Sequence, residues 1–287
     1  MTTELMAKER LSPNIPLFAL EGMGGSGKSH VIRLLASQLN ESGLNVLGCK
    51  ISGMGSGDRI DRLRCINAAR KDLLENGLAS EKIKEDKRKD RIFRLAMHHQ
   101  VKSLIKQTTG TNSGFDIAIL DRTPMMPWVY SASNDPDNPY LEEILNDGLR
   151  TTAQMGISSV YVLDVSPETA FARMIGRMCV GKEDFEKMVA DLCKIIKAPD
   201  QASHEIATRS INFITNNHGL MPKTYEKYAL IPYDVMVNER SKFVEAAMLL
   251  NSKLGIGYKV VDAEKPIDQV VTIIIEDMRV SLARASA

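Results

Sequence analysis

The sequence has few of the features that mark secreted, membrane or nucleic-acid-binding proteins. It contains four cysteines, none at C-x-x-C spacing, so neither a zinc site nor a disulfide framework is predicted. No stretch approaches the roughly 18 consecutive apolar residues of a membrane span, and the N-terminal segment lacks an apolar signal region. The formal net charge is only +1, which gives no general attraction to nucleic acid or to an anionic membrane. We therefore expect a cytoplasmic protein whose partner is a small molecule, not a nucleic acid polymer or a membrane.

Short apolar runs alternate along the chain with longer segments of helical periodicity, and 44% of the 287 residues are hydrophobic. This alternation is typical of a parallel sheet covered by helices on both faces, and the length suffices for one large α/β domain. We predict a lead-in at residues 1–14, a single domain at 15–287 and, within it, a lid and helical insertion at about 176–238. The insertion could be a substrate-covering lid, a dimer surface or a helical satellite at one edge of the sheet. Five strands are predicted, at residues 17–20, 46–49, 117–120, 160–163 and 258–261.

The segment FALEGMGGSGKS, at residues 18–29, places an apolar run before a glycine-rich loop with the spacing G-x-x-x-x-G-K-S/T. A chain that wraps a triphosphate turns its backbone N–H groups inward, and glycines allow the dihedral angles and the close approach that this requires. Apolar residues at helical spacing follow, so a helix N-terminus would point its partial positive charge at the anion. Lys28 would reach the β and γ phosphates, and the Ser29 hydroxyl would bind Mg²⁺. The residues expected at this phosphate cradle are Gly22, Gly24, Gly25, Ser26, Gly27, Lys28, Ser29 and His30.

The segment FDIAILDR, at residues 115–122, is an apolar strand that places Asp121 and Arg122 at its carboxyl end. In parallel sheets this edge is where ligands bind. Asp121 could hold Mg²⁺ or accept a proton from an attacking hydroxyl, and Arg122 could clamp a phosphate with two hydrogen bonds. The structural alternative is that Asp121 and Arg122 form a surface pair that caps the strand.

Four segments resemble, in this order, the thymidylate kinase family of nucleoside monophosphate kinases. They are LEGMGGSGKS near the start, ILDR after the third strand, YVLDVSPETAFARMIGR at 161–177 and VVDAEKPIDQVV at 260–271. The resemblance covers residues 17–180 and 240–280. It implies a P-loop kinase three-layer α/β sandwich with a five-stranded parallel sheet of order 2-3-1-4-5, and a homodimer. It also implies ATP with Mg²⁺ as the donor, and transfer of the γ-phosphoryl group to the phosphate of a bound nucleotide.

The resemblance also implies roles for individual residues. Arg122 matches the arginine that grips the acceptor phosphate. Arg173 and Arg177 match the region of the mobile lid, whose arginines neutralise charge on the transferred group. Their four-residue separation on a helix is also typical of a solvated basic face. Ala263 matches the loop beside the adenine of ATP.

Several acceptor-side positions differ from the family pattern. Gly24 stands where thymidylate kinases usually have an acidic residue, and Lys50 begins a segment that lacks their Arg-Glu-Pro sequence. Met97 stands where an arginine meets the thymine base, and methionine cannot donate a hydrogen bond to a base carbonyl. Thr123 replaces a tyrosine. Thymidine monophosphate is therefore not favoured as the acceptor.

These observations together predict an ATP-dependent phosphotransferase that acts on a nucleoside monophosphate or a related small acceptor. Two alternatives stay open: a small-molecule or nucleoside hydroxyl kinase on the same fold, and an ATP-binding protein that has lost transfer activity. A nucleotide-dependent switch or transporter is not favoured, because the sequence lacks the N-K-x-D and L-S-G-G-Q motifs. Met125, Met126 and Trp128 either line an apolar acceptor pocket or seal the end of the strand against a helix.

Overall fold

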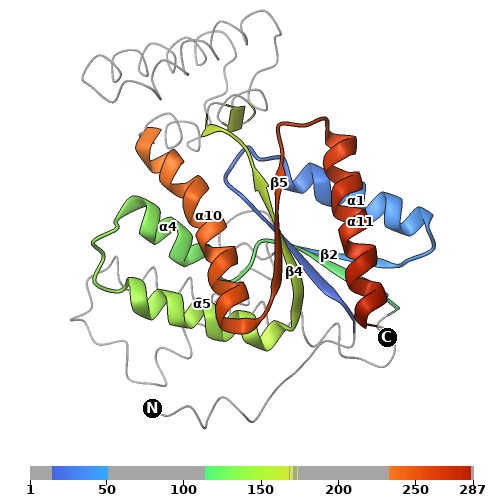
Figure 1. Cartoon of the computed structure of the whole chain (residues 1–287), viewed down its shortest axis with the longest axis horizontal. Coiled ribbons are helices and arrows are strands. Elements are labelled where there is room, and N and C mark those ends of the chain that lie inside the picture. Colours follow the sequence, from blue (N-terminus) through green and yellow to red (C-terminus); the bar gives the residue numbers. More distant parts are fainter. Residues whose placement is uncertain (1–14, 51–113, 168, 171–172, 174–232, 286–287) are drawn as a thin grey trace, which may run out of the picture.

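The centre of the molecule is a sheet of five parallel strands in the order β2-β3-β1-β4-β5 (Figure 1). The computed structural model describes residues 15–50, 114–167, 169–170, 173 and 233–285. The predicted sheet order 2-3-1-4-5 is confirmed, and each predicted strand is present with its ends shifted by a few residues at most. The strands are β1 (Leu17–Glu21), β2 (Val46–Lys50), β3 (Ile117–Asp121), β4 (Ile157–Asp164) and β5 (Gly257–Asp262).

Helices cover both faces of this sheet, which gives the predicted three layers. Figure 1 shows α1 and α11 on one side of the sheet, and α4, α5 and α10 on the other. The helices are α1 (Lys28–Glu41), α4 (Met126–Asn134), α5 (Leu141–Met155), α10 (Tyr233–Leu254) and α11 (Ile267–Ala285). The α10 helix begins within the insertion predicted at about 176–238. The part of the insertion before α10 lies outside the described residues, and so does the predicted lead-in at residues 1–14.

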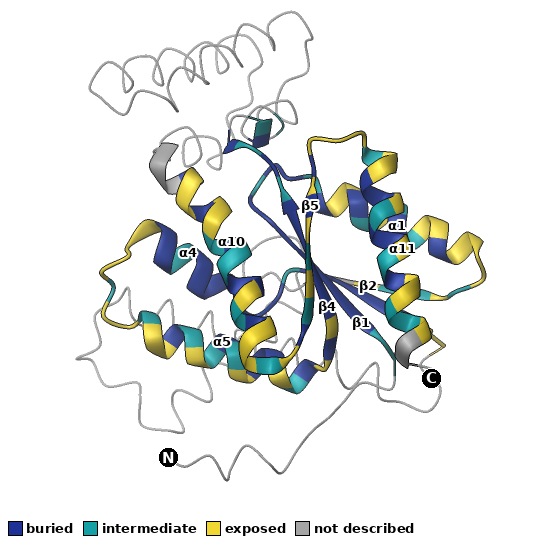
Figure 2. Cartoon of the chain, viewed as in Figure 1, coloured by how far each residue is buried: buried dark blue, intermediate teal, exposed yellow. Residues whose placement is uncertain are grey.

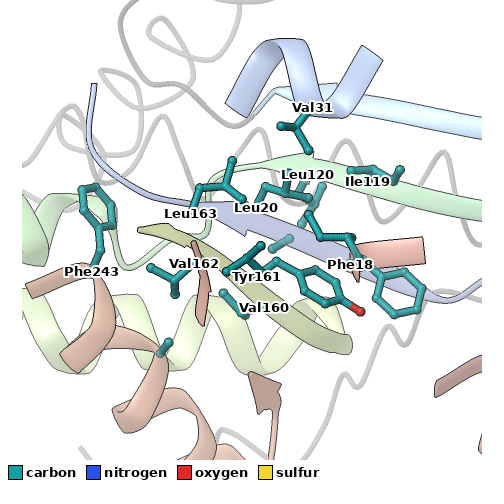
Figure 3. Close-up of a cluster of buried hydrophobic side chains, with 14 of the residues drawn as sticks. Phe18, Leu20, Val31, Ile119, Leu120, Val160, Tyr161, Val162, Leu163 and Phe243 are labelled. Carbon is teal, nitrogen blue, oxygen red and sulfur yellow. The ribbon is translucent and has the colours of Figure 1, made fainter. Parts of the chain in front are cut away.

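The hydrophobic core lies between the sheet and the two helical layers, as the buried strands in Figure 2 show. All residues of β1 and β3 are buried, as expected for central strands of a parallel sheet. Phe18 and Tyr161 are completely buried, their ring centroids lie 6.3 Å apart, and Figure 3 shows them among the aliphatic side chains of neighbouring strands. Full burial of one such side chain contributes roughly 1.5–3 kcal/mol, so this core fixes the strands that position the site.

The carboxyl ends of the strands meet at one edge of the sheet. Leu20 of β1 pairs with Asp121 of β3, and Glu21 pairs with Val162 of β4. Because these pairings are parallel, Glu21 and Asp121 reach the same edge, where the loop between β1 and α1 also begins.

In the part of the chain that the structure describes, no helix combines the length and the apolar composition needed to cross a membrane.

Candidate active site

The loop between β1 and α1 adopts a conformation that depends on its glycines. Gly22, Gly25 and Gly27 have φ angles of 134°, 81° and 90°, a region that residues with side chains rarely adopt. A Cβ at Gly22 would lie 2.6 Å from the carbonyl oxygen of Leu163, and one at Gly25 would overlap the backbone of Ala170. The loop is therefore closely packed against the segment that begins at the end of β4, and only glycine fits at these two positions.

Lys28 lies inside this loop and is only 7% exposed. Its Nζ donates hydrogen bonds to the carbonyl oxygens of Gly22 (2.5 Å) and Met23 (3.0 Å) and to Oγ of Ser26 (3.3 Å). Burial, helped by the positive charge of Arg122, lowers the pKa of Lys28 from its ordinary value of 10.5 to about 7. The ammonium group is thus held at the centre of the loop, where the phosphates of a nucleotide would be bound.

The N-terminus of α1 follows directly after the loop. Gly27 is its N-cap, no side chain caps it, and its first turn contains no acidic residue. The positive end of the helix is therefore not neutralised by a side chain of that first turn, which suits the binding of an anion.

Ser29 and Asp121 come together beside the helix start. Oγ of Ser29 donates a hydrogen bond to Oδ2 of Asp121 over 3.3 Å, although the residues lie on different elements, α1 and β3. Among the described residues there is no group of three or more His, Cys, Asp and Glu side chains that could hold a metal ion. Mg²⁺ takes oxygen ligands, and it is commonly bound by one or two protein groups together with water and substrate phosphates. The hydroxyl and the carboxylate are of the chemical types in that ligand set, and their role as Mg²⁺ ligands stays a prediction.

Arg122 occupies a conformation that is unusual for a residue with a side chain. Its φ of 89° lies in the left-handed region, which costs about 1–3 kcal/mol and persists only where the surroundings enforce it. Nη1 donates a hydrogen bond to the carbonyl oxygen of Gly22 over 3.2 Å and lies 3.7 Å from Oε2 of Glu21. The guanidinium carbon lies 5.6 Å from the ring centroid of Tyr130 and 5.4 Å from that of Phe243. The side chain is therefore turned inward toward the loop at residues 22–27, the predicted phosphate-binding loop, with aromatic rings close to its guanidinium group.

Glu21, the last residue of β1, belongs to the site although the sequence analysis did not select it. It is 3% exposed, and its Oε1 accepts hydrogen bonds from the backbone N–H (2.5 Å) and the hydroxyl (2.7 Å) of Thr123. Burial raises the pKa of Glu21, while Arg122 and the hydrogen bonds from Thr123 oppose that rise. A single carboxyl group that ends an otherwise apolar, fully buried strand was the signal in the sequence that could have identified it.

Glu239, on α10, is a second residue that sequence reasoning missed. It is 9% exposed, and its negative charge favours the protonated forms of both Lys28 and Arg122. Burial lowers the pKa of Arg122, but Tyr130 and then the surrounding carboxyl groups outweigh burial and raise it. Glu239 lies one helical turn before the residue whose ring contacts Arg122. No local pattern marks it, because its neighbours belong to other parts of the sequence.

A cavity of about 340 Å³ is lined in part by the loop residues Ser26 and Gly27. Its lining includes His30, Arg173, Ala263 and Lys265, together with apolar residues of α1 and α11. Nη2 of Arg173 donates a hydrogen bond to the carbonyl oxygen of Ala263 over 3.0 Å. Five of the predicted residues therefore line one cavity: Ser26, Gly27, His30, Arg173 and Ala263. Arg177 lies outside the described residues.

The apolar side chains that follow Thr123 pack in the hydrophobic core at the end of β3. Met125, Met126 and Trp128 are at most 6% exposed and belong to the hydrophobic core. The Nζ atom of Lys242, on α10, lies 5.4 Å from the ring centroid of Trp128. Of the two interpretations from the sequence, the structure favours the one in which these side chains pack the end of β3 against the helices.

Gly24 lies in the loop, half-buried, with an ordinary φ.

No protein-family model matches the chain, and no curated protein matches its sequence. Among solved structures, the chain is similar to two of deoxyadenosine kinase from M. mycoides, one with bound dATP and one with the products dCMP and a flexible dCDP. Each is 14% identical with a TM-score of 0.47, over 92% of this chain and 99% and 98%, respectively, of the other. At this level the likeness supports no conclusion about activity, and the narrower expectation of a thymidylate kinase stays a prediction. The sheet order, the loop and the helices on both faces are those of the P-loop kinase fold predicted from the sequence.

Proposed function

We propose that this protein is an ATP-dependent phosphotransferase. The observation that supports this most directly is the convergence of Lys28, Ser29, Asp121 and Arg122 at the start of α1. Phosphoryl transfer needs little covalent chemistry from the protein, and depends on alignment of the reactants and on positive charge around the transferred group. The site supplies two cationic side chains, a helix N-terminus and a pair of oxygen ligands within one loop and one strand end.

The donor side is formed by the phosphate-binding loop and the adjoining cavity. Lys28 already sits between the loop carbonyls, and it would exchange these acceptors for phosphate oxygens when a nucleotide binds. Ser29 and Asp121 would hold Mg²⁺, which supplies charge neutralisation of the phosphates when bound. The cavity that contains His30, Arg173 and Ala263 is the space available for the base and sugar of ATP. Arg173 would contact the nucleotide from the segment that follows β4.

The acceptor side would be formed around Arg122. Its guanidinium group lies at the same loop carbonyl as the Lys28 ammonium group, so a group bound to Arg122 would lie next to the γ-phosphate held by Lys28. For a hydroxyl acceptor, the alternative role of Asp121, the preceding residue, is to accept the proton of the attacking hydroxyl. The resemblance stated above favours a nucleoside monophosphate as the acceptor.

A hydroxyl acceptor is the second candidate, and the charges of the described residues favour it. Two cationic side chains, Lys28 and Arg122, are surrounded by three carboxyl groups, those of Glu21, Asp121 and Glu239. An acceptor phosphate would bring about two more negative charges into this environment, whereas a hydroxyl group brings none. The carboxyl groups therefore disfavour a monophosphate relative to a neutral alcohol of a nucleoside or another small molecule.

The experiment that tests the proposal is product identification. The protein is incubated with ATP, Mg²⁺ and a panel of nucleoside monophosphates, nucleosides and sugars, and products are identified by mass spectrometry. We expect ADP and one phosphorylated acceptor, absence of both with Lys28→Ala, and normal turnover with the control Lys253→Ala, which changes a lysine in the last turn of α10. Tight ATP binding without any phosphorylated product would favour an ATP-binding protein that has lost transfer activity.

A further inference from the structure

The carboxyl group of Glu21 connects the two halves of the site. Glu21 is followed directly by Gly22, whose carbonyl oxygen accepts hydrogen bonds from Lys28 and from Arg122. Its own Oε1 accepts two hydrogen bonds from Thr123, the residue after Arg122. Glu21 is thus joined by its backbone to the first residue of the phosphate-binding loop. Its side chain is hydrogen-bonded to Thr123, just beyond the end of β3.

The contacts with Thr123 fix the backbone on one side of Arg122. The N–H of Arg122 donates to the carbonyl oxygen of Leu20 over 3.0 Å, which continues the pairing of β3 with β1. The next N–H, that of Thr123, donates to Oε1 of Glu21. Arg122 is therefore held at both of its peptide groups by neighbouring residues of β1. These two anchors explain how a residue with a side chain is kept at a φ of 89°.

The hydroxyl of Thr123 extends this arrangement into α4. It donates to Oε1 of Glu21 and accepts a hydrogen bond from the backbone N–H of Met125 over 3.2 Å. The turn that leads from β3 into α4 is thereby tied to the same carboxylate. Tyr130, whose ring lies beside the Arg122 guanidinium group, is on that helix.

The second oxygen of Glu21 faces Arg122. Oε2 is buried and makes no hydrogen bond in the structure, and it lies 3.7 Å from Nη1 of Arg122. A buried carboxylate is stable only near a compensating charge, and Arg122 supplies that charge by forming an ion pair with this oxygen. The ion pair draws the guanidinium group toward the loop, because the attraction acts on the donor that also binds Gly22.

We propose that Glu21 is a positioning residue, which sets the backbone conformation of Arg122 through Thr123 and the direction of its guanidinium group through Oε2. This inference deepens the proposed phosphotransferase function, in which Arg122 holds the acceptor, and it rests on that function for its catalytic consequence. Glu21 itself touches neither reactant. Its main effect is on acceptor binding, because the hydrogen bonds that shape the loop around Lys28 do not involve its side chain. The charge of Glu21 makes only a smaller contribution to the protonation of Lys28 than burial, Arg122 and Asp121 do.

The principal variant is Glu21→Gln, which keeps the size of the side chain and one oxygen acceptor for Thr123. Its amide NH₂ would face the guanidinium group, so a donor would replace an acceptor opposite Arg122. We expect the KM for the acceptor to rise about tenfold or more, with the ATP dissociation constant within about twofold of the unmodified protein. Glu41→Gln, which changes an exposed carboxylate on α1, is the control and should alter neither value.

A chemical readout tests the inference even if no acceptor is found. Phenylglyoxal reacts with accessible guanidinium groups, and peptide mass spectrometry measures the rate at Arg122, with the exposed Arg150 as internal reference. We expect slow labelling of Arg122 in the unmodified protein and labelling at least about fivefold faster in Glu21→Gln. If the panel of acceptors yields no product while Arg122 labelling responds in this way, the phosphotransferase proposal fails and the positioning role of Glu21 stands.

A second pair of variants covers the case in which Glu21→Gln does not fold. Thr123→Val removes the hydroxyl that donates to Glu21, and Thr123→Ser keeps it. We expect faster Arg122 labelling in Thr123→Val and a return toward the unmodified rate in Thr123→Ser. The inference would be overturned if Arg122 in folded Glu21→Gln were labelled at the same rate as in the unmodified protein. If Glu21→Gln does not fold, an unchanged labelling rate in Thr123→Val would overturn it.

Discussion

Lys28 and Arg122 donate hydrogen bonds to the same atom, the carbonyl oxygen of Gly22, over 2.5 and 3.2 Å. The two cations come from different elements, the start of α1 and the end of β3, and the positive charge of Arg122 contributes to the lowered pKa of Lys28. Two cationic side chains therefore meet at the first turn of the loop, with the carboxyl groups of Glu21, Asp121 and Glu239 around them. An anion that binds there would relieve the repulsion between them.

Replacement of Lys28 by methionine should separate function from stability. Lys28→Met should abolish phosphoryl transfer, while the free energy of unfolding at pH 7 should rise by about 1–2 kcal/mol because a buried charge is removed. The pKa of Lys28 is about 7 in the folded protein and 10.5 when exposed, so between these values the unfolded chain binds more protons. The free energy of unfolding of the unmodified protein should therefore rise with pH across this window. The difference in that free energy between Lys28→Met and the unmodified protein should become smaller. Urea unfolding of both proteins at pH 7 and pH 9 measures this difference in free energy. A difference that grows with pH would contradict a lowered pKa of Lys28.

ATP binding should take up a proton above neutral pH. With a pKa of about 7, Lys28 is mostly neutral at pH 8 in the free protein, and the phosphates of ATP favour its protonated form. The dissociation constant for ATP should increase by up to about tenfold per pH unit between pH 8 and pH 9. Calorimetry in two buffers of different ionisation enthalpy gives the number of protons taken up, which should approach one. Lys28→Met should show no such uptake.

Asp121 and Asp116 offer a matched test of the magnesium pair, because they lie at opposite ends of β3. Asp121 accepts a hydrogen bond from Ser29, whereas Asp116 accepts one from the backbone N–H of Asn45. Asp121→Asn should raise the Mg²⁺ concentration needed for half-maximal ATP turnover by about tenfold, since an amide is a weaker ligand than a carboxylate. Asp116→Asn keeps an oxygen acceptor and should not change it. Equal Mg²⁺ requirements in the two variants would remove Asp121 from the metal site.

Gly25 and Gly43 separate backbone strain from steric overlap. Their φ angles are similar, 81° and 89°, but a Cβ at Gly25 would overlap the backbone of Ala170, whereas one at Gly43 meets nothing within 4 Å. Gly43→Ala should cost about 1 kcal/mol of stability from the left-handed conformation alone. Gly25→Ala should cost at least about 3 kcal/mol and weaken ATP binding, because the loop must move away from the backbone of Ala170. Thermal unfolding and nucleotide titration measure the two effects, and equal losses would mean that the loop is not packed as described.

The local patterns of the sequence were sufficient for the architecture and for the conformation of the loop between β1 and α1. The roles of the site residues stay predictions. Apolar runs such as the one ending at Asp121 fix a strand, because burial on both faces requires a continuous apolar segment. The glycines before Lys28 fix the loop, since their dihedral angles are excluded for other residues. The homodimer and the identity of the acceptor stay predictions.

Only the tertiary structure decided which side chains share the site with that loop. Glu21 and Thr123 are brought together by the register of β1 against β3, and Glu239 by the packing of α10 against the neighbouring helices and strands. The tertiary structure also turns Arg122 inward. It buries Trp128, for which the sequence allowed either a place in an acceptor pocket or packing at the end of the strand. The reason is physical: periodicity and turn chemistry act over a few residues, whereas the charge and burial of a side chain depend on neighbours supplied by the whole fold.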